Sequence, residues 1–452
     1  AARGISQRAF DEMVQENIDE LGMDPAEALE DVLQTLTLQG VDLSGIVTCL
    51  PGEVIPVIDC LRKLEEEEAH SEVVELLAQL NGFFTDKGSG NASVAAKNGA
   101  VELLISLCRK LRRRQSDGDG DRGFISALNA MAAVIHDLRT SETFREQGGP
   151  NLVVDVLQND EENVDTIDAC FSVVAAASTG NELLKESFMD LKIDNLILRT
   201  LTKLDGRTLP AVYDAIRIIL SPDDNRVVAS QVFGYARQFS KSGIPEALVD
   251  ALRGGLTSPH SISATTALKA VAVNDEICKS VASAGGIDAV LRSIEESSRQ
   301  GNNDLARASC SLLSKLAGSD ENKRAVVGSR GMEKLVSLSA RFSRDPSVVQ
   351  EVMSVICCLC LRSPENAARA MESGAGDLAV RAMHDFPKSD QLQRSSCFMI
   401  RNLVARNPEN RKILVSNGIE ALIRRAKENH GRTCKDAATD ALRDLGVDNY
   451  NS

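Results

Sequence analysis

Aspartate and glycine alternate over residues 117–121 and supply the oxygen atoms that calcium prefers. A calcium-binding loop of the EF-hand type needs glycine at its sixth position and, at its twelfth, a glutamate that binds through both carboxylate oxygens. Counted from Asp117, those positions hold Arg122 and Leu128. The sequence therefore predicts a polar acidic loop here and no calcium site.

Cysteines provide a second pattern with metal-binding potential, because Cys357 and Cys360 have the two-residue spacing of zinc ligands. Tetrahedral zinc needs four ligands, and no second pair of cysteines or histidines lies nearby in the sequence. The pair lies in an apolar helical stretch, so we expect thiols that pack as small apolar groups. The total of 11 cysteines is odd, which is typical of free thiols in a reducing compartment.

Catalytic patterns are also missing from the sequence. None of the five histidines accompanies a nucleophile in a recognisable arrangement: His70, His136, His260, His384 and His430. We find no glycine-rich phosphate loop, no GxSxG and no HExxH. We therefore expect a protein that is not an enzyme and has no catalytic, metal-binding or cofactor-binding residues.

Charge and hydropathy narrow the classes of partner. The net charge is −14 over 452 residues, and such a chain is repelled by nucleic acid backbones and by anionic membrane surfaces. A basic protein segment would complement it, although the charge could instead serve only to keep a large helical surface soluble. No apolar run is long enough to span a membrane, and the first residues lack the apolar core of a secretory signal. We expect a cytoplasmic or nuclear protein, or one found in both places.

A repeat in the sequence predicts the helices that would position any functional site. Asn322, Asn366 and Asn410 lie 44 residues apart in three similar polar stretches. A glycine follows each of them eight or nine residues later, at Gly331, Gly374 and Gly418. A recurrence of this length indicates an array of structural repeats, in which each block buries its apolar surface against the next.

Within one period we expect a short helix, a glycine bend, a longer helix, a polar break and a third helix. Residues 274–316 illustrate this order with helices at 275–283, 287–297 and 305–316, a bend at Gly285-Gly286 and a break at 301–303. Aromatic residues make up only 3% of the chain and there is no tryptophan, so the core must consist mainly of Leu, Ile, Val and Ala.

The terminal segments lie outside the period. Residues 1–68 contain two predicted amphipathic helices, 9–21 and 24–39, and Asp24-Pro25 is a strong start signal for the second. We interpret 1–68 as an N-terminal helical cap over the apolar end of the array, with a separate docking segment as the alternative. Residues 69–446 would then contain about eight repeats, and 447–452 a short C-terminal tail.

The ends of two predicted third helices, Ala127-Leu128-Asn129-Ala130 and Ile400-Arg401-Asn402-Leu403, carry a recognisable signature. Together with the first-helix asparagine, the glycine bend and the Ile/Leu-rich second helix, it resembles the armadillo repeat family over about residues 71–446. The resemblance implies an all-α, right-handed superhelical solenoid of armadillo-type three-helix repeats.

The resemblance also implies a groove lined by the third helices, whose asparagine position can hold the backbone of an extended peptide. The matching positions in this sequence are Asn129, Arg217, Lys269, Lys315, Cys358 and Asn402. The three consecutive cations predict a basic stripe for an acidic or phosphorylated segment, and the alternative is that they are solvated surface residues. Nuclear-import adaptors of the family pair an asparagine ladder with tryptophans, which this chain lacks.

We expect a non-enzymatic scaffold that binds protein partners along this groove, without nucleic acid or membrane. Three alternatives remain open at this point: a nuclear-transport-type adaptor for a basic cargo peptide, a structural subunit of a large assembly such as a cytoskeletal one, and an enzyme or enzyme subunit. Binding of a basic localisation peptide would favour the first and a fixed stoichiometry the second. A deep pocket with clustered titratable groups would favour the third.

Overall fold

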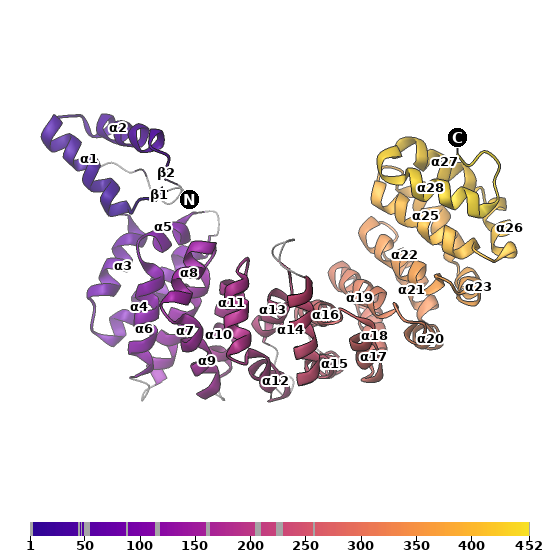
Figure 1. The fold of residues 1–452 in the computed structure, drawn as a ribbon, viewed down its shortest axis with the longest axis horizontal. Helices are drawn as coiled ribbons and strands as arrows, with labels where there is room; N and C mark the ends of the chain where they lie inside the picture. Colours follow the sequence, from indigo (N-terminus) through magenta and orange to yellow (C-terminus); the bar gives the residue numbers. More distant parts are fainter. Residues whose placement is uncertain are drawn as a thin grey trace. The chain divides into compact units, whose positions relative to one another are not determined.

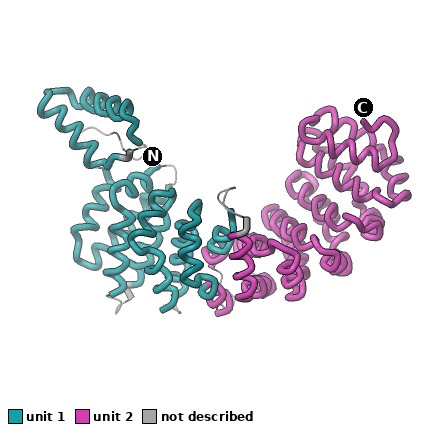
Figure 2. The backbone as a smooth tube through the Cα atoms, viewed as in Figure 1, with its two compact units in different colours: residues 1–196, 214–229 teal, residues 197–213, 230–452 magenta. Residues whose placement is uncertain are grey.

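The computed structural model describes residues 3–43, 46, 48, 55–86, 89–113, 118–159, 163–203, 209–222, 229–255 and 258–451. These residues form 28 helices and one pair of two-residue strands. The chain divides into two compact units (Figure 2). Unit 1 comprises residues 1–196 and 214–229, and unit 2 comprises residues 197–213 and 230–452.

The N-terminal segment is a helical hairpin with a core of its own. It contains β1 (Arg3–Gly4), α1 (Gln7–Leu21), α2 (Pro25–Leu38) and β2 (Val41–Asp42), and β1 pairs in parallel with β2. The two helices confirm those predicted at 9–21 and 24–39, and the Asp24 side chain accepts a hydrogen bond from the backbone N–H of Ala26, as expected of a cap. The buried members of its core are Phe10, Val14, Ala28, Val32 and Leu36.

After α3 (Pro56–Glu66) and α4 (His70–Phe84), the described residues form eight triplets of helices (Figure 1). The first four triplets are α5 (Asn91–Lys97), α6 (Ala100–Arg112) and α7 (Gly118–Val134); α8 (Leu138–Glu146), α9 (Gly149–Asn159) and α10 (Val164–Ser178); α11 (Glu182–Asp190), α12 (Ile193–Lys203) and α13 (Pro210–Ile219); and α14 (Ala229–Ser242), α15 (Ile244–Arg253) and α16 (Ser258–Val271).

The last four triplets are α17 (Asp275–Ser283), α18 (Gly286–Gln300) and α19 (Asn303–Leu316); α20 (Asp320–Gly328), α21 (Gly331–Arg341) and α22 (Pro346–Cys360); α23 (Pro364–Glu372), α24 (Ala375–Asp385) and α25 (Asp390–Val404); and α26 (Pro408–Ser416), α27 (Ile419–Asn429) and α28 (Gly431–Leu445). Residues 447–451 follow, and the backbone carbonyls of Asp448, Asn449 and Tyr450 accept hydrogen bonds from Arg424 and Lys427 of α27.

Equivalent helices of successive triplets pack against one another. In unit 1, α4 contacts α7 and α7 contacts α10, whereas in unit 2 the third helices α16, α19, α22, α25 and α28 contact one another in series. Most of their buried residues are aliphatic, as the composition predicted. Each unit is therefore built as an all-α solenoid, which confirms the predicted fold class.

The bend before each second helix places one residue in the left-handed backbone region. Gly374 has φ +100° at the start of α24, which a side chain would strain. At the start of α18, Gly286 has no room for a side chain, because an added Cβ would lie 2.5 Å from Cγ1 of Val281. Two bends instead use a non-glycine residue with positive φ, Lys192 before α12 and Arg330 before α21. The bend before α21 therefore lies at Arg330, one residue before Gly331. Gly331 itself allows close packing.

The recurring asparagines hold consecutive helices together. The side-chain Nδ2 of Asn322, Asn366 and Asn410 donates to the backbone carbonyls of Leu316 (2.8 Å), Leu359 (2.9 Å) and Leu403 (2.7 Å). Each amide therefore satisfies a carbonyl at the C-terminal end of the preceding third helix, where helices leave carbonyls without partners. All three asparagines are buried, so this part of the repeat signature has a structural role.

The two patterns that suggested metal binding lie in helical regions. Gly118–Asp121 form the first turn of α7, which corrects the predicted polar loop at these residues, and Asp117 lies outside the described residues. Cys360 is buried in α22, whereas Cys357 and Cys358 are half-buried, and burial raises the pKa of the Cys357 thiol to about 12. Within the described chain, no group of three or more His, Cys, Asp or Glu side chains is placed to hold a metal ion. None of the described helices combines the length and apolar character needed to cross a membrane.

Candidate partner-binding surface

The five groove residues predicted from the sequence lie in both units. Asn129 of α7 and Arg217 of α13 belong to unit 1, whereas Lys269 of α16, Lys315 of α19 and Asn402 of α25 belong to unit 2. Only these last three lie on helices of one continuous stack (Figure 1). The three unit 2 residues therefore lie on one stack of helices, and Asn129 and Arg217 are described separately below.

The burial pattern shows that the residues assigned to the asparagine position of the third helices do not occupy equivalent positions along those helices. Every third helix of unit 2 from α16 to α25 ends in two adjacent buried residues, which are Val271-Ala272, Leu316-Ala317, Leu359-Cys360 and Leu403-Val404. Lys315, Cys358 and Asn402 directly precede this pair, but Lys269 lies two residues before it. The residue that corresponds to Lys315 in α16 is Ala270. In unit 1, Arg217 lies two residues before its buried pair and Asn129 five residues before.

Lys269 and Lys315 are nevertheless connected through Ser311, which Lys269 contacts from α16 and which lies one helical turn before Lys315 on α19. The Nζ of Lys269 donates to Oγ of Ser311 across the α16–α19 contact at 2.6 Å. Arg307 precedes Ser311 by four residues and Lys315 follows it by four, so the three side chains share one face of α19. We call Lys269, Arg307, Ser311 and Lys315 the Ser311 cluster. Arg307 and Ser311 were not predicted from the sequence, although they lie eight and four residues before Lys315, a spacing that places all three on one helix face.

The cluster has an excess of positive charge. Arg307 pairs with the exposed Asp304 at 2.8 Å, whereas Lys315 is exposed and makes no ion pair or side-chain hydrogen bond with the described residues. On the next third helix, α22, the half-buried Glu351 faces the same cations. Burial raises the pKa of the Glu351 carboxyl group, and Lys269 and Arg307 oppose this shift. The half-buried Glu351 carboxyl group, whose pKa is raised, therefore lies near the cations of Lys269 and Arg307.

Several other polar groups on these third helices already have partners. The Nδ2 of Asn402 donates to the backbone carbonyl of Cys357 at 2.9 Å, so this amide links α25 to α22. Arg401 pairs with both Asp440 and Asp444 of α28, each at 3.1 Å. Arg394 lies over the ring of Phe398, 5.1 Å from its centroid. The Ser311 cluster is thus a place on these helices where described cations retain unused hydrogen-bond donors.

Arg217 and Asn129 have different surroundings in unit 1. Arg217 is half-buried, and its Nη2 lies 3.4 Å from Oδ1 of Asp214 on the same helix. Asn129 is exposed on α7, and its side chain makes no hydrogen bond with any residue that the structure describes. Neither residue joins the Ser311 cluster.

Comparisons with known proteins agree with this architecture. A family model described as "Armadillo repeat-containing protein 6 N-terminal domain" matches residues 2–75, and a model named ARMC6 matches residues 57–450. Human Armadillo repeat-containing protein 6 is 29% identical over 392 residues, which cover 81% of this chain and 75% of the relative. The Drosophila melanogaster homolog is 26% identical over 385 residues, covering 82% and 80%.

One solved structure, that of an engineered protein, superposes with a TM-score of 0.58 at 17% sequence identity. It covers 87% of this chain and 100% of its own, and at this identity the similarity concerns the fold alone. The ARMC6 model spans most of the chain, includes all eight triplets and confirms the resemblance to armadillo repeats. The chain therefore belongs to the ARMC6 family.

Proposed function

We propose that this protein is a non-enzymatic scaffold and that unit 2 binds an acidic or phosphorylated segment of a protein partner along its third helices. The observation that carries the proposal is the Ser311 cluster, in which Lys269 donates to the Ser311 hydroxyl and Lys315 lies one turn further along the same face of α19. The family and the helical repeat fold support a scaffold role in general terms, because stacked repeats present a continuous surface.

The chemistry of the cluster favours an anion. A carboxylate or phosphate between Lys269 and Lys315 accepts charge-assisted hydrogen bonds, which are about twice as strong as those between neutral groups. The Ser311 hydroxyl adds a further donor, because its O–H can rotate toward the bound anion. A basic segment would meet like charges here, and like-charge contact costs affinity. The cluster therefore favours acidic over basic segments even though the whole chain carries a net negative charge.

The test is fluorescence anisotropy with a labelled peptide of alternating glutamate and glycine, and with a twin in which lysine replaces each glutamate. We expect the acidic peptide to bind the unmodified chain and to lose about tenfold or more in affinity with Lys269→Glu/Lys315→Glu, because two attractive charges become repulsive. Raising the salt concentration from about 0.05 M to about 0.3 M should also weaken binding.

The matched control is Lys279→Glu/Lys412→Glu, which makes the same charge change on exposed lysines of the first helices α17 and α26. This control should retain the affinity of the unmodified chain within about twofold, because distant sites act independently. Equal losses in the two double variants would show a general charge effect and refute the site. Preference for the lysine peptide would refute the proposal and support an adaptor for basic cargo.

A further inference from the structure

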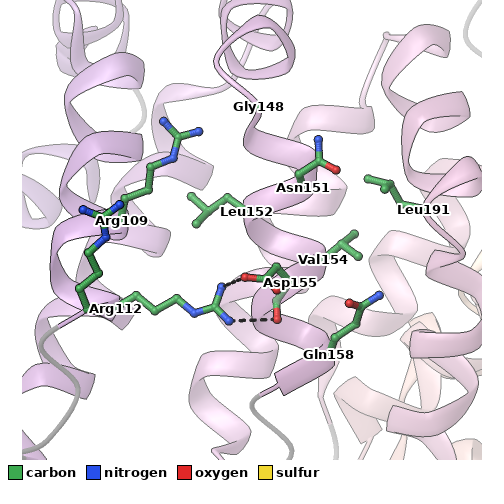
Figure 3. Close-up of a pocket in the computed structure, with 10 residues that line it drawn as sticks. Arg109, Arg112, Gly148, Asn151, Leu152, Val154, Asp155, Gln158 and Leu191 are labelled. Carbon is green, nitrogen blue, oxygen red and sulfur yellow. Dashed lines mark hydrogen bonds and ion pairs between the residues drawn. The ribbon is translucent and has the colours of Figure 1, made fainter.

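A cavity of about 810 Å³ lies between the second helices α6 and α9 of unit 1 (Figure 3). Its walls include three arginines, Arg109, Arg112 and Arg113, which all come from the C-terminal part of α6. In the first turn of α9, Leu152 points toward the arginines, whereas Asn151 points the other way, toward Leu191 (Figure 3). Part of the floor is therefore apolar and one wall is strongly cationic.

The arginines keep donors available after their internal contacts. Arg112 pairs with the carboxylate of Asp155 and donates to the Asp155 backbone carbonyl at 3.2 Å. Arg109 donates through Nη2 to the backbone carbonyl of Gln147 at 2.6 Å. A guanidinium has five N–H donors, so each retains several. Arg113 is exposed and makes no hydrogen bond or ion pair with other described residues.

A depression at the corresponding place in unit 2 has a different balance of charge among its described residues. A cavity of about 530 Å³ lies between the second helices α18 and α21 and also contains three cations. There the cations face carboxylates, since Lys334 pairs with Glu295 at 3.1 Å and Arg330 lies 3.9 Å from Glu333. Arg299 pairs with Glu296 of its own helix. Among the described residues that line the unit 1 cavity, three arginines face the single carboxylate of Asp155.

We propose that the unit 1 cavity binds a phosphomonoester group, which Arg109 and Arg113 contact while Arg112 is held in place by Asp155. The planar guanidinium matches two phosphate oxygens at once, and this makes arginine the preferred residue for such groups. The positive end of the α9 helix dipole lies at the same wall and adds to the attraction. The group could belong to a phosphorylated side chain or to a free phosphate, and the experiment separates these sources.

The experiment measures binding of a labelled phosphoserine peptide and of its unphosphorylated twin by fluorescence anisotropy. It uses the full chain carrying Lys269→Glu/Lys315→Glu, so that the Ser311 cluster of unit 2 does not contribute. We expect the phosphopeptide to bind about tenfold or more tightly than its twin, and the preference to vanish with the added change Arg109→Gln/Arg113→Gln. Failure of the Ser311 proposal would leave this result unchanged, because the sites lie in different units.

Two variants control for indirect effects. Arg299→Gln/Arg330→Gln removes two arginines from the neutralised cavity of unit 2 and should leave binding within about twofold. Arg113→Gln alone removes only an exposed side chain without internal contacts, and it should weaken binding even if the double variant fails to fold. Equal binding of the two peptides, or equal losses in the unit 1 and unit 2 variants, would overturn the proposal.

Inorganic phosphate added as a competitor identifies the source of the group. Displacement of the peptide by inorganic phosphate at a similar concentration supports the site and indicates a free phosphate ligand. Displacement only at about a hundredfold higher concentration supports the site with a phosphorylated segment, whose remaining contacts would supply about 2.7 kcal/mol. No displacement at any concentration would place the peptide elsewhere and contradict the proposal.

Discussion

The contacts that join successive triplets, called joints here, include a buried charge in unit 1 and three neutral amides in unit 2. In unit 1, Lys185 of α11 has a fully buried side chain, pairs with Glu182 at 3.0 Å and donates to the backbone carbonyl of Ser221 at 2.7 Å. In unit 2, the joints contain Asn322, Asn366 and Asn410, which donate to the ends of third helices. A buried charge depends on its partner far more than a neutral amide does.

Two lysines make the comparison direct. Lys185 and Lys323 each lie four residues after the residue that caps their helix, Asn181 or Ser319, and each donates to a backbone carbonyl at the end of the next third helix. Lys323 pairs with Asp320, whose side chain is 88% exposed, whereas the partner of Lys185, Glu182, is 17% exposed. Both lysines are therefore buried, but the carboxylate that pairs with them is exposed to water in α20 and largely buried in α11.

The largest expected effect is the loss of the Lys185 ammonium group. Lys185→Met leaves Glu182 in its buried place without this cation, and we expect a cost of about 3–5 kcal/mol in the free energy of unfolding around α11. Lys323→Met should cost about 1 kcal/mol, because water can solvate Asp320 in its place. Native-state hydrogen exchange of the α11 and α20 amides measures both. Similar costs for the two lysines would break the distinction between the units.

Loss of one of these asparagines in unit 2 should destabilise only the triplets on either side of it. Asn366→Leu gives α23 the residue type that α11 has at the corresponding position, Leu184, and leaves the Leu359 carbonyl without its amide donor. We expect a loss of about 1–3 kcal/mol. Because repeats contact only their neighbours, faster exchange should be confined to α22–α25, with α4 and α7 as the internal reference. Acceleration throughout the chain would show that the joints act cooperatively.

The helices themselves could be predicted closely from the sequence. Those expected at 275–283, 287–297 and 305–316 are observed at Asp275–Ser283, Gly286–Gln300 and Asn303–Leu316. Cap residues, glycine bends and the apolar period are local features, and they fix where a helix begins and which face is apolar. The role of the recurring asparagines was not predictable in the same way, since it depends on which carbonyls lie near them in the folded chain.

The register of Lys269 shows why the site was harder to predict. Lys269, Cys358 and Asn402 each lie five residues before the cap of the following first helix, so counting from that cap makes them equivalent. The later triplets have one extra residue in this connection, Arg362 or Arg406, which adopts positive φ. That residue shifts the helix register by one without changing the repeat signature. The neighbours Ser311 and Glu351 come from other triplets, and only the stacking of helices brings them to Lys269.

The smallest expected effect concerns two carboxylates that respond to pH in opposite directions. Glu142 of α8 accepts hydrogen bonds from Asn181 and Arg145, and these hold its pKa below the usual 4.5. Its contribution to folding is present above that value and is lost as the pH falls through the folded-state pKa. Urea unfolding should therefore show Glu142→Gln less stable than the unmodified chain at about pH 7, with the difference shrinking as the pH falls through the lowered folded-state pKa.

Glu351 of unit 2 should show the reverse behaviour, because burial raises its pKa and the folded state favours the protonated form. Its contribution to folding stability is complete below pH 4.5 and is lost as the pH rises through the folded-state pKa. Glu351→Gln should therefore be the more stable chain at about pH 7 and lose that advantage at about pH 3.5. If Glu351→Gln is instead less stable than the unmodified chain at neutral pH, the Glu351 carboxylate stabilises the fold as that of Glu142 does. The expected gain would instead mean that unit 2 keeps an unfavourable carboxylate beside the Ser311 cluster. Perturbed groups of this kind concentrate where proteins bind ligands, and that would strengthen the assignment of this face as the binding surface.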